Sequence, residues 1–178
     1  MSAELTFEKV WLMFQETDRQ HKETEKLFKE TDKKLRSLET LFTGQWGKLM
    51  ESLVEGDLIK LLKQRGLSVN QTYQRVKKMF NGQEIEFDLV AKNGTDVVIV
   101  EVKTTLRQED VEHFLNKLAI LKEAFPEYKD NKVYGAITYL RSESESHKRA
   151  MRKGLFVIRA TGNSSSIINS TDFQPTAF

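Results

Sequence analysis

Apolar residues recur with heptad spacing in the N-terminal part of the chain. The members of this series are Phe7, Phe14, His21, Phe28, Leu35 and Phe42. If they take the a position, the d position holds Val10, Thr17, Thr24, Thr31 and Leu38. Sustained a/d patterning without Gly or Pro is typical of a long coiled-coil helix. Because such a helix cannot bury its apolar stripe alone, we expect residues 1–43 to mediate self-association into a homo-oligomer.

Three details qualify this helix. Threonine is half polar and β-branched, so its repeated use at d predicts a weak or wide seam. A lone polar residue at a is typically a register device, and we interpret His21 in that way rather than as a metal ligand. Gly44 and Gly47 are expected to end or kink the helix.

From residue 44 onward, helical and strand periodicities alternate. A largely buried helix is predicted over 46–65, with Gly66 as its C-terminal stop. Strands are predicted over 67–76, 83–91, 96–103, 132–140 and 155–160, and helices over 108–124 and 144–153. The tail after Gly162 is expected to be irregular. The order α-β-β-β-α-β-α-β predicts an α/β fold with a mixed sheet over residues 44–178.

A hairpin is predicted between the second and third strands, because Asn93-Gly94 is the preferred pair for a two-residue turn. A type I′ turn there places Asp88 opposite Ile99. The same register places Glu86 opposite Glu101, and these like charges would repel each other unless a cation compensates them.

Period-two alternation gathers the charged residues of this hairpin on one face. That face carries Glu84, Glu86, Asp88, Ile99, Glu101 and Lys103. The other face carries Ile85, Phe87, Leu89, Val98, Val100 and Val102. Asp88 and Glu101 become diagonal neighbours about 7–8 Å apart, near enough to share one divalent cation. The alternative is a solvated face of an antiparallel hairpin, but the apolar run Val97–Val100 favours a covered central strand.

Asp88 followed by Glu101-Val102-Lys103 resembles the D…(D/E)-x-K signature of the PD-(D/E)XK nuclease superfamily. That group includes restriction endonucleases and archaeal-type Holliday-junction resolvases. Its shared core is α-β-β-β-α-β, so the resemblance covers about residues 49–160 and implies a restriction-endonuclease-like core. Phe87 stands where the superfamily's name has proline. The layout is also similar to that of uncharacterised bacterial proteins with a nuclease-like core behind a coiled coil.

The resemblance implies metal-dependent hydrolysis of DNA phosphodiesters. Asp88 and Glu101 would bind Mg²⁺ or Mn²⁺, which prefer hard oxygen ligands. The carbonyl of Val102 would be a further ligand. Lys103 would orient the attacking water and offset charge on the phosphate.

A glutamate from the first helix often completes such a site. Glu55 in "EGDLIKLLKQRG" matches the resolvase-like spacing to Gly66, and it would hold a coordinated water or a second ion. Its place on an apolar helix face, where an unpaired carboxylate is costly, favours a functional role. Glu51, one turn earlier on the same side, is the competing candidate.

Composition narrows the remaining function classes. The chain has no cysteine, which excludes disulfides, thiolate chemistry and Cys-based zinc sites. No apolar run has the roughly 18 residues needed to span a bilayer, and the N-terminus lacks a signal-peptide pattern. We therefore expect a cytoplasmic protein without a membrane partner.

The charge balance leaves two functions open. A net charge of +2 permits DNA binding without establishing it. The basic clusters at 75–78 and 147–153 are interpreted as solvated faces more than as phosphate contacts. The alternative to a nuclease is a non-catalytic oligomeric module that binds nucleic acid or protein on the same fold.

Overall fold

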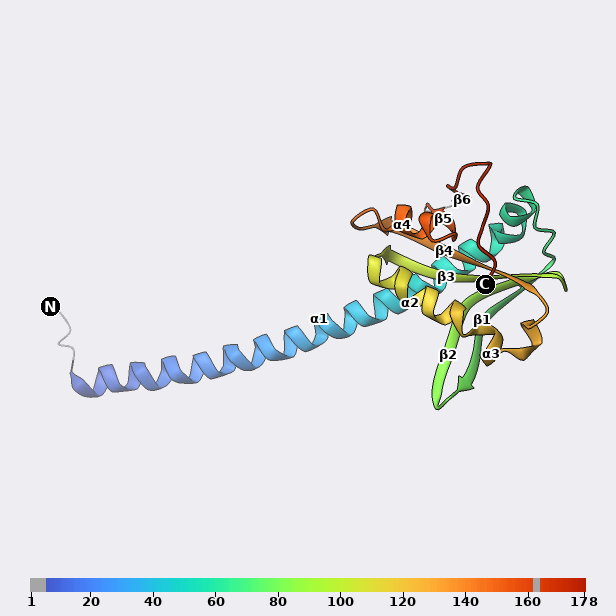
Figure 1. Cartoon of the computed structure of the whole chain (residues 1–178). Coiled ribbons are helices and arrows are strands. Elements are labelled where there is room, and N and C mark those ends of the chain that lie inside the picture. The colour runs from blue at the N-terminus through green and yellow to red at the C-terminus, as the bar shows by residue number, and fades with distance from the viewer. Residues whose placement is uncertain (1–5, 162–163) are drawn as a thin grey trace. The chain divides into compact units, whose positions relative to one another are not determined.

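A computed structural model describes residues 6–161 and 164–178, without the side chains of residues 39–43 and 46 (Figure 1). The predictions that rest on the side chains of Phe42 and Trp46 lie outside this described part. Contacts divide the chain into two units, residues 1–45 and 46–178, and each is described by itself. The predicted boundary between residues 43 and 44 stays a prediction.

The first helix, α1 (Phe7–Gln64), contains Gly44 and Gly47 in its interior. The expectation that the helix ends at these glycines is wrong. Each glycine costs only about 1 kcal/mol in a helix interior relative to alanine, which the surrounding helix-forming sequence offsets. The end predicted at Gly66 agrees with the structure. Its φ of +81° is the left-handed conformation that glycine adopts readily, and its N–H donates to the carbonyl of Lys63.

The described a positions of the heptad series are exposed. Phe7, Phe14 and Phe28 have exposed fractions of 84%, 66% and 73%. The d-position hydroxyl of Thr17 donates to the carbonyl of Met13, so it is satisfied within its own helix. Pairing in a coiled coil stays a prediction. No helix in the described part of the chain is long and apolar enough to cross a membrane.

The second unit is built on a six-stranded mixed sheet, which confirms the predicted α/β class (Figure 1). The strands, in spatial as in chain order, are β1 (Gln71–Phe80), β2 (Gln83–Lys92), β3 (Asp96–Leu106), β4 (Lys132–Ser142), β5 (Phe156–Ala160) and β6 (Ser165–Ile167). β3 pairs in parallel with β4, and β4 with β5, whereas the other neighbours are antiparallel. The helices after β3 and β4 are α2 (Gln108–Ala119), α3 (Leu121–Ala124), the 3₁₀ turn η1 (Pro126–Tyr128) and α4 (Ser146–Arg152).

Three further element predictions differ from the structure, and one of them is the helix predicted over 108–124, which is divided into α2 and α3. The first strand begins at Gln71 rather than Leu67, because Leu67 and Val69 are buried loop residues whose alternation imitates a strand. The tail was expected to be irregular, yet β6 pairs with β5. Ser165 helps to fix it, since its N–H and hydroxyl both donate to the carboxylate of Asp57 at 2.9 Å.

The sheet has a hydrophobic core on each face. On one face, α2, α3 and α4 contribute Val111, Phe114, Leu118, Leu121, Ala124 and Ala150. On the other face, α1 contributes Val54, Leu58, Leu61 and Leu62. β3 supplies both cores, with Val97 and Ile99 in the first and Val98 and Val100 in the second. This two-sided burial explains why β3 is nearly continuously apolar.

Candidate active site

The turn between β2 and β3 is longer than the sequence predicts. Lys92 pairs with Val97, so residues 93–96 form a four-residue connection. The side-chain oxygen of Asn93 accepts hydrogen bonds from the N–H groups of Thr95 at 3.0 Å and Asp96 at 2.7 Å. This capping by asparagine stabilises the longer loop in place of a two-residue turn. The predicted register is therefore wrong by two residues.

A shift of two residues changes the partner of each side chain but does not by itself move a side chain to the other face. Pairing between β2 and β3 runs from Lys92 and Val97 to Leu89 and Val100. One more step would bring Asp88 opposite Glu101, but the described ladder ends before it. We call this place the β2–β3 fork, and it contains Asp88 of β2 and Glu101, Val102 and Lys103 of β3.

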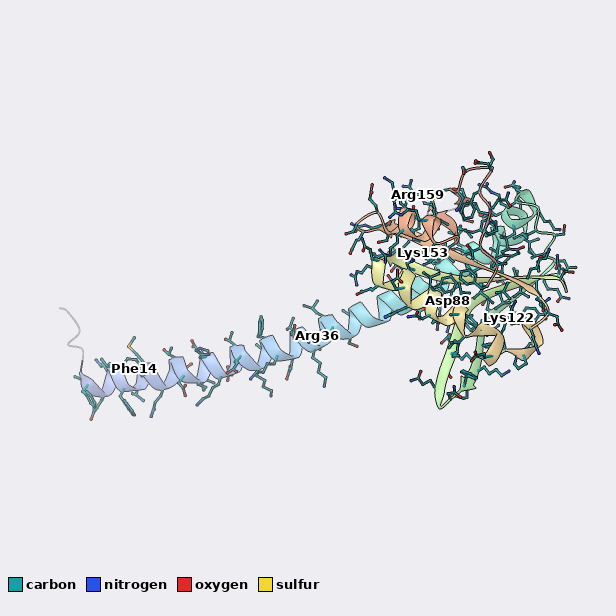
Figure 2. The ribbon with its side chains drawn as sticks, viewed as in Figure 1. Phe14, Arg36, Asp88, Lys122, Lys153 and Arg159 are labelled. Atoms are coloured by element: carbon teal, nitrogen blue, oxygen red, sulfur yellow. The ribbon has the colours of Figure 1, made fainter. Side chains whose placement is uncertain are left out.

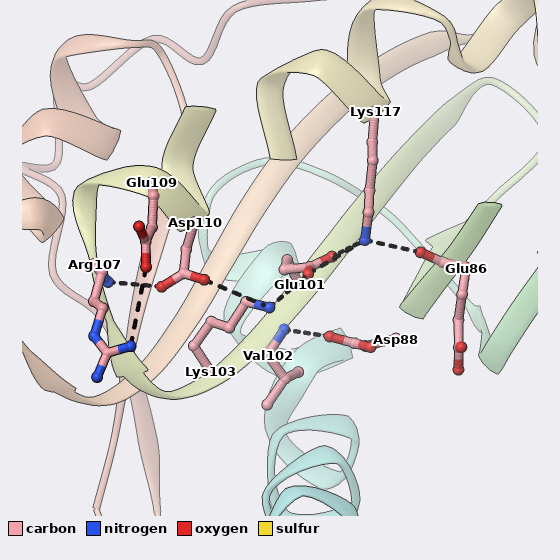
Figure 3. A network of polar contacts seen from close by, with 9 residues as sticks. All are labelled: Glu86, Asp88, Glu101, Val102, Lys103, Arg107, Glu109, Asp110 and Lys117. Atoms are coloured by element: carbon pink, nitrogen blue, oxygen red, sulfur yellow. Dashed lines mark hydrogen bonds and ion pairs between the residues drawn. The ribbon is translucent and has the colours of Figure 1, made fainter. Parts of the chain in front are cut away.

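Asp88 lies at the β2–β3 fork and is held by the backbone of β3. Its carboxylate accepts a hydrogen bond from the N–H of Val102 at 2.7 Å (Figure 3). The predicted opposition of Glu86 and Glu101 does not occur. Lys77 on β1 compensates Glu86 instead, with its ammonium 3.0 Å from the Glu86 carboxylate.

The predicted all-apolar face of the hairpin is also wrong. Ile85 and Phe87 belong to the core under α2, whereas Leu89 belongs to the core under α1. The paired residues of β1 and β2 omit Arg75 and Asp88, and Arg75 has a φ of +50°. The register is the same on both sides of this break, so no residue is inserted, and the side chains of β2 change face across it.

Glu101 is the most enclosed carboxylate of the site. Only 8% of its side chain is exposed, and two ammonium groups compensate it. Lys103 lies 3.0 Å from Oε1, and Lys117 on α2 lies 3.0 Å from Oε2 and 3.3 Å from Oε1. The Lys117 ammonium also donates to the backbone carbonyl of Glu86 at 3.1 Å, so it bridges β2 and β3 at the fork (Figure 3).

Lys117 was not among the residues singled out from the sequence. A signal was present, because Lys117 directly precedes the buried Leu118 and follows the buried Phe114 by three positions. A lysine on the apolar face of an amphipathic helix needs a carboxylate or carbonyl partner.

Lys103 connects the site to the start of α2. Its ammonium lies 3.8 Å from the carboxylate of Asp110, which accepts a hydrogen bond from the N–H of Arg107 at 2.8 Å (Figure 3). Burial by itself would lower the pKa of Lys103, but Glu101, Asp110 and Asp88 together raise it above its ordinary value. Lys103 therefore carries its positive charge at neutral pH.

Asp88 is electrostatically unfavourable in its ionised form. The pKa of its carboxyl is raised from 3.8 to about 6, chiefly by burial and then by the charges of Glu101 and Glu51. The Val102 hydrogen bond and the charge of Lys103 oppose this shift without cancelling it.

The two glutamates of α1 have different surroundings. Glu55 accepts hydrogen bonds from Thr72 at 3.0 Å and from the side-chain amide of Gln74. Glu51 accepts two hydrogen bonds from the guanidinium of Arg75, at 3.1 and 3.2 Å. Of the two, Glu51 is the one whose charge acts on Asp88.

Asp88 and Glu101 provide the donor chemistry that Mg²⁺ and Mn²⁺ prefer, which is two carboxylates on adjacent strands. Their mutual repulsion contributes to the raised pKa of Asp88, and a divalent cation would relieve it. Within the described residues, no group of three His, Asp or Glu side chains is assembled to hold an ion. At the β2–β3 fork, Asp88 and Glu101 are the two carboxylates that could hold such an ion, and both oxygens of Glu101 already contact lysine ammonium groups.

Most of the basic residues named from the sequence are paired with carboxylates. Besides Arg75 and Lys77, Lys78 lies 3.5 Å from Glu127 and Arg149 lies 2.6 Å from Glu112. These ion pairs agree with the interpretation of the clusters as surface faces rather than dedicated phosphate contacts.

Comparison with known proteins identifies a family but does not assign an activity to the chain. No curated protein matches the chain. A crystal structure titled as a protein of unknown function, AF1548, is 20% identical with a TM-score of 0.34, and it matches 57% of this chain and 54% of its own. The chain thus spans about half the length of that structure. The model of the family described as "Domain of unknown function (DUF8196)" matches residues 57–167, and the chain belongs to this family.

Proposed function

We propose that the protein is a metal-dependent nuclease of the PD-(D/E)XK type that hydrolyses DNA phosphodiesters. The observation that carries the proposal is the meeting of Asp88, Glu101 and Lys103 at the β2–β3 fork. Lys103 contacts Glu101 at 3.0 Å, and the residue between them in the chain, Val102, holds Asp88 through its N–H.

Each residue has a definite role in this proposal. Asp88 and Glu101 would hold Mg²⁺ or Mn²⁺, which would supply Lewis-acid activation of water and of the phosphate. Lys103 donates to the attacking water or to a phosphate oxygen and offsets the charge that develops there. Both glutamates of α1 are hydrogen-bonded by β1, and we favour Glu51 over Glu55 as the helix carboxylate because its charge contributes to the raised pKa of Asp88. The N–H of Val102 donates to the carboxylate of Asp88. The Val102 carbonyl stays a candidate metal ligand, as the resemblance implies.

A row of residues at matching positions of β3, β4 and β5 supports the proposal that the substrate is anionic. Lys103 is in register with Tyr139 on β4, and Tyr139 is in register with Arg159 on β5. Register partners in parallel strands point to the same face. His147 stacks on the Tyr139 ring with centroids 5.8 Å apart. Arg159, which Figure 2 labels, is exposed. An exposed guanidinium aligned with Lys103 suits a phosphate backbone that continues past the site.

The test is a cleavage assay on the full chain with linear, branched and single-stranded DNA in Mg²⁺ or Mn²⁺. We expect cleavage by the wild type and a loss of about 100-fold or more in Lys103→Ala and Asp88→Asn, the size that loss of one transition-state contact produces. Lys129→Ala and Asp130→Asn, at exposed positions before β4, are the matched controls and should retain activity. A folded wild type that cuts none of these substrates in either metal contradicts the proposal.

A second candidate function is supported by the state of Glu101. Two ammonium groups already compensate its charge, so this carboxylate needs no metal, and in this alternative the fold binds nucleic acid or protein without catalysis. In that case the wild type would retain DNA on a filter, and retention would be the same with and without divalent metal.

We also propose that the functional form is an oligomer held by the N-terminal helix. We expect light scattering of the wild type to give at least twice the chain mass of 20.7 kDa. Phe28→Glu, at an exposed a position, should reduce this to the mass of one chain, because a buried charge opposes pairing. Leu12→Glu changes an equally exposed apolar residue at the outward f position and should leave the mass unchanged. A wild type with the mass of one chain contradicts this proposal.

A further inference from the structure

Lys117 occupies a position on Glu101 that a divalent cation would need. Its ammonium contacts both oxygens of the Glu101 carboxylate, and Lys103 contacts one of them as well. With 8% of its side chain exposed, Glu101 has little access to water as a substitute partner. Both oxygens of the better-buried carboxylate are therefore engaged by cations that belong to the chain.

We infer that Lys117 is a resident counter-ion that competes with divalent metal for Glu101 and weakens metal binding at the β2–β3 fork. This rests on the proposed function only in requiring that Asp88 and Glu101 bind a metal, and it does not require DNA cleavage. A metal ion that ligates Glu101 would lie within a few ångströms of the Lys117 ammonium if the lysine stayed in place. Like charges at that distance repel strongly in a partly buried site.

Lys117 has a hydrogen-bond partner besides Glu101. Its bond to the Glu86 carbonyl, at 3.1 Å, does not depend on the carboxylate. When metal binds, the ammonium can release Glu101, keep this carbonyl and complete its hydrogen bonds with water, since 33% of the side chain is exposed. Lys117 is thus a positioning residue that holds Glu101 in the metal-free protein.

Lys103 is less suited to this competing role. It contacts a single oxygen of Glu101 and has a further carboxylate, Asp110, at 3.8 Å. It also comes from the same strand as Glu101, whereas Lys117 reaches in from α2. Of the two lysines, only Lys117 connects α2 to both strands of the fork.

The test is a calorimetric titration of the full chain with Mn²⁺ alone, without DNA. We expect Lys117→Met, which keeps the stem and removes the charge, to lower the Mn²⁺ dissociation constant by about tenfold, within what removing one adjacent charge produces. Lys117→Gln, whose amide retains a donor for the Glu86 carbonyl, should lower it similarly. Lys122→Met on α3 removes a lysine of similar intermediate exposure and should change the dissociation constant by less than about twofold, since Lys122, unlike Lys117, forms no ion pair with Glu101.

The outcomes separate this inference from the proposed nuclease activity. Tighter Mn²⁺ binding in both Lys117 variants supports the inference even if the wild type cuts no DNA. An unchanged or weaker affinity in the two folded variants overturns it, and so does a failure of wild type and variants alike to bind Mn²⁺. A gain in Lys122→Met equal to that in Lys117→Met also overturns it, because the effect would then come from net charge.

Discussion

Replacing Glu101 by glutamine is expected to lower the free energy of unfolding by about 3 kcal/mol at neutral pH. The substitution conserves shape but removes the negative charge that compensates Lys103 and Lys117. Breaking a buried ion pair by removing one partner costs about 3–5 kcal/mol, because the remaining charge is left without compensation. Both lysines retain about a third of their side-chain exposure, so the lower end of this range applies.

Chemical denaturation of Glu101→Gln measures this change through the shift of the unfolding midpoint. Glu127→Gln is the control, since Glu127 forms an exposed ion pair with Lys78 at 3.5 Å and should change stability by less than about 0.5 kcal/mol. A Glu101→Gln protein as stable as the wild type would show that water compensates the two lysines and that Glu101 does not hold the fork together.

Asp88→Asn is expected to have the opposite sign and to stabilise the protein by about 2 kcal/mol at pH 8. The pKa of Asp88 is raised from 3.8 to about 6 in the folded chain, chiefly by burial and next by Glu101. A rise of roughly 2 pKa units corresponds to at most about 3 kcal/mol, and partial solvation reduces it. Asparagine removes the charge and keeps a side-chain oxygen that accepts the hydrogen bond from Val102.

The pH dependence follows from the direction of the shift. Between about pH 4 and pH 6 the folded protein binds more protons at Asp88 than the unfolded chain, so the contribution of this group to stability falls as pH rises. Above pH 6 the full penalty is present, and below pH 4 it is absent. The stabilising effect of Asp88→Asn should therefore appear across this window and vanish near pH 4.

Unfolding curves at pH 4, 6 and 8 measure the effect, and Asp130→Asn, at an exposed position, serves as the control with no comparable trend. An Asp88→Asn protein less stable than the wild type at pH 8 would mean that Asp88 stabilises the fold. If Asp88→Asn is more stable than the wild type, Asp88 behaves as a residue that is kept for function at a cost in stability.

The opposite signs follow from one structural difference between two neighbouring carboxylates. Glu101 has cationic partners supplied by β3 and α2, whereas Asp88 has one backbone N–H and the repulsion of nearby acids. The site thus contains one compensated carboxylate and one uncompensated carboxylate. In the proposed nuclease, divalent metal supplies the charge that Asp88 lacks.

The element order and the grouping of Asp88, Glu101 and Lys103 were predictable from the sequence. Hydrophobic periodicity defines helices and strands locally, and the strand period of two fixes which side chains share a face. Glu101 and Lys103 share a face because they lie two residues apart on β3, whatever the register of the hairpin. The resemblance to the PD-(D/E)XK signature depends on the same spacing, and the nuclease activity stays a prediction.

Only the tertiary structure decided which residues complete the site. The Asn93 side chain lengthens the turn, the pairing of β1 with β2 is interrupted at Asp88 and at Arg75 with its positive φ, and Lys117 reaches Glu101 from a helix that follows in the chain. These features depend on side-chain hydrogen bonds, backbone conformation at one residue and contacts between distant segments. A local sequence pattern specifies periodicity within an element, whereas the partners of Glu101, Glu86 and Asp88 are set by how β1, β3 and α2 pack against β2.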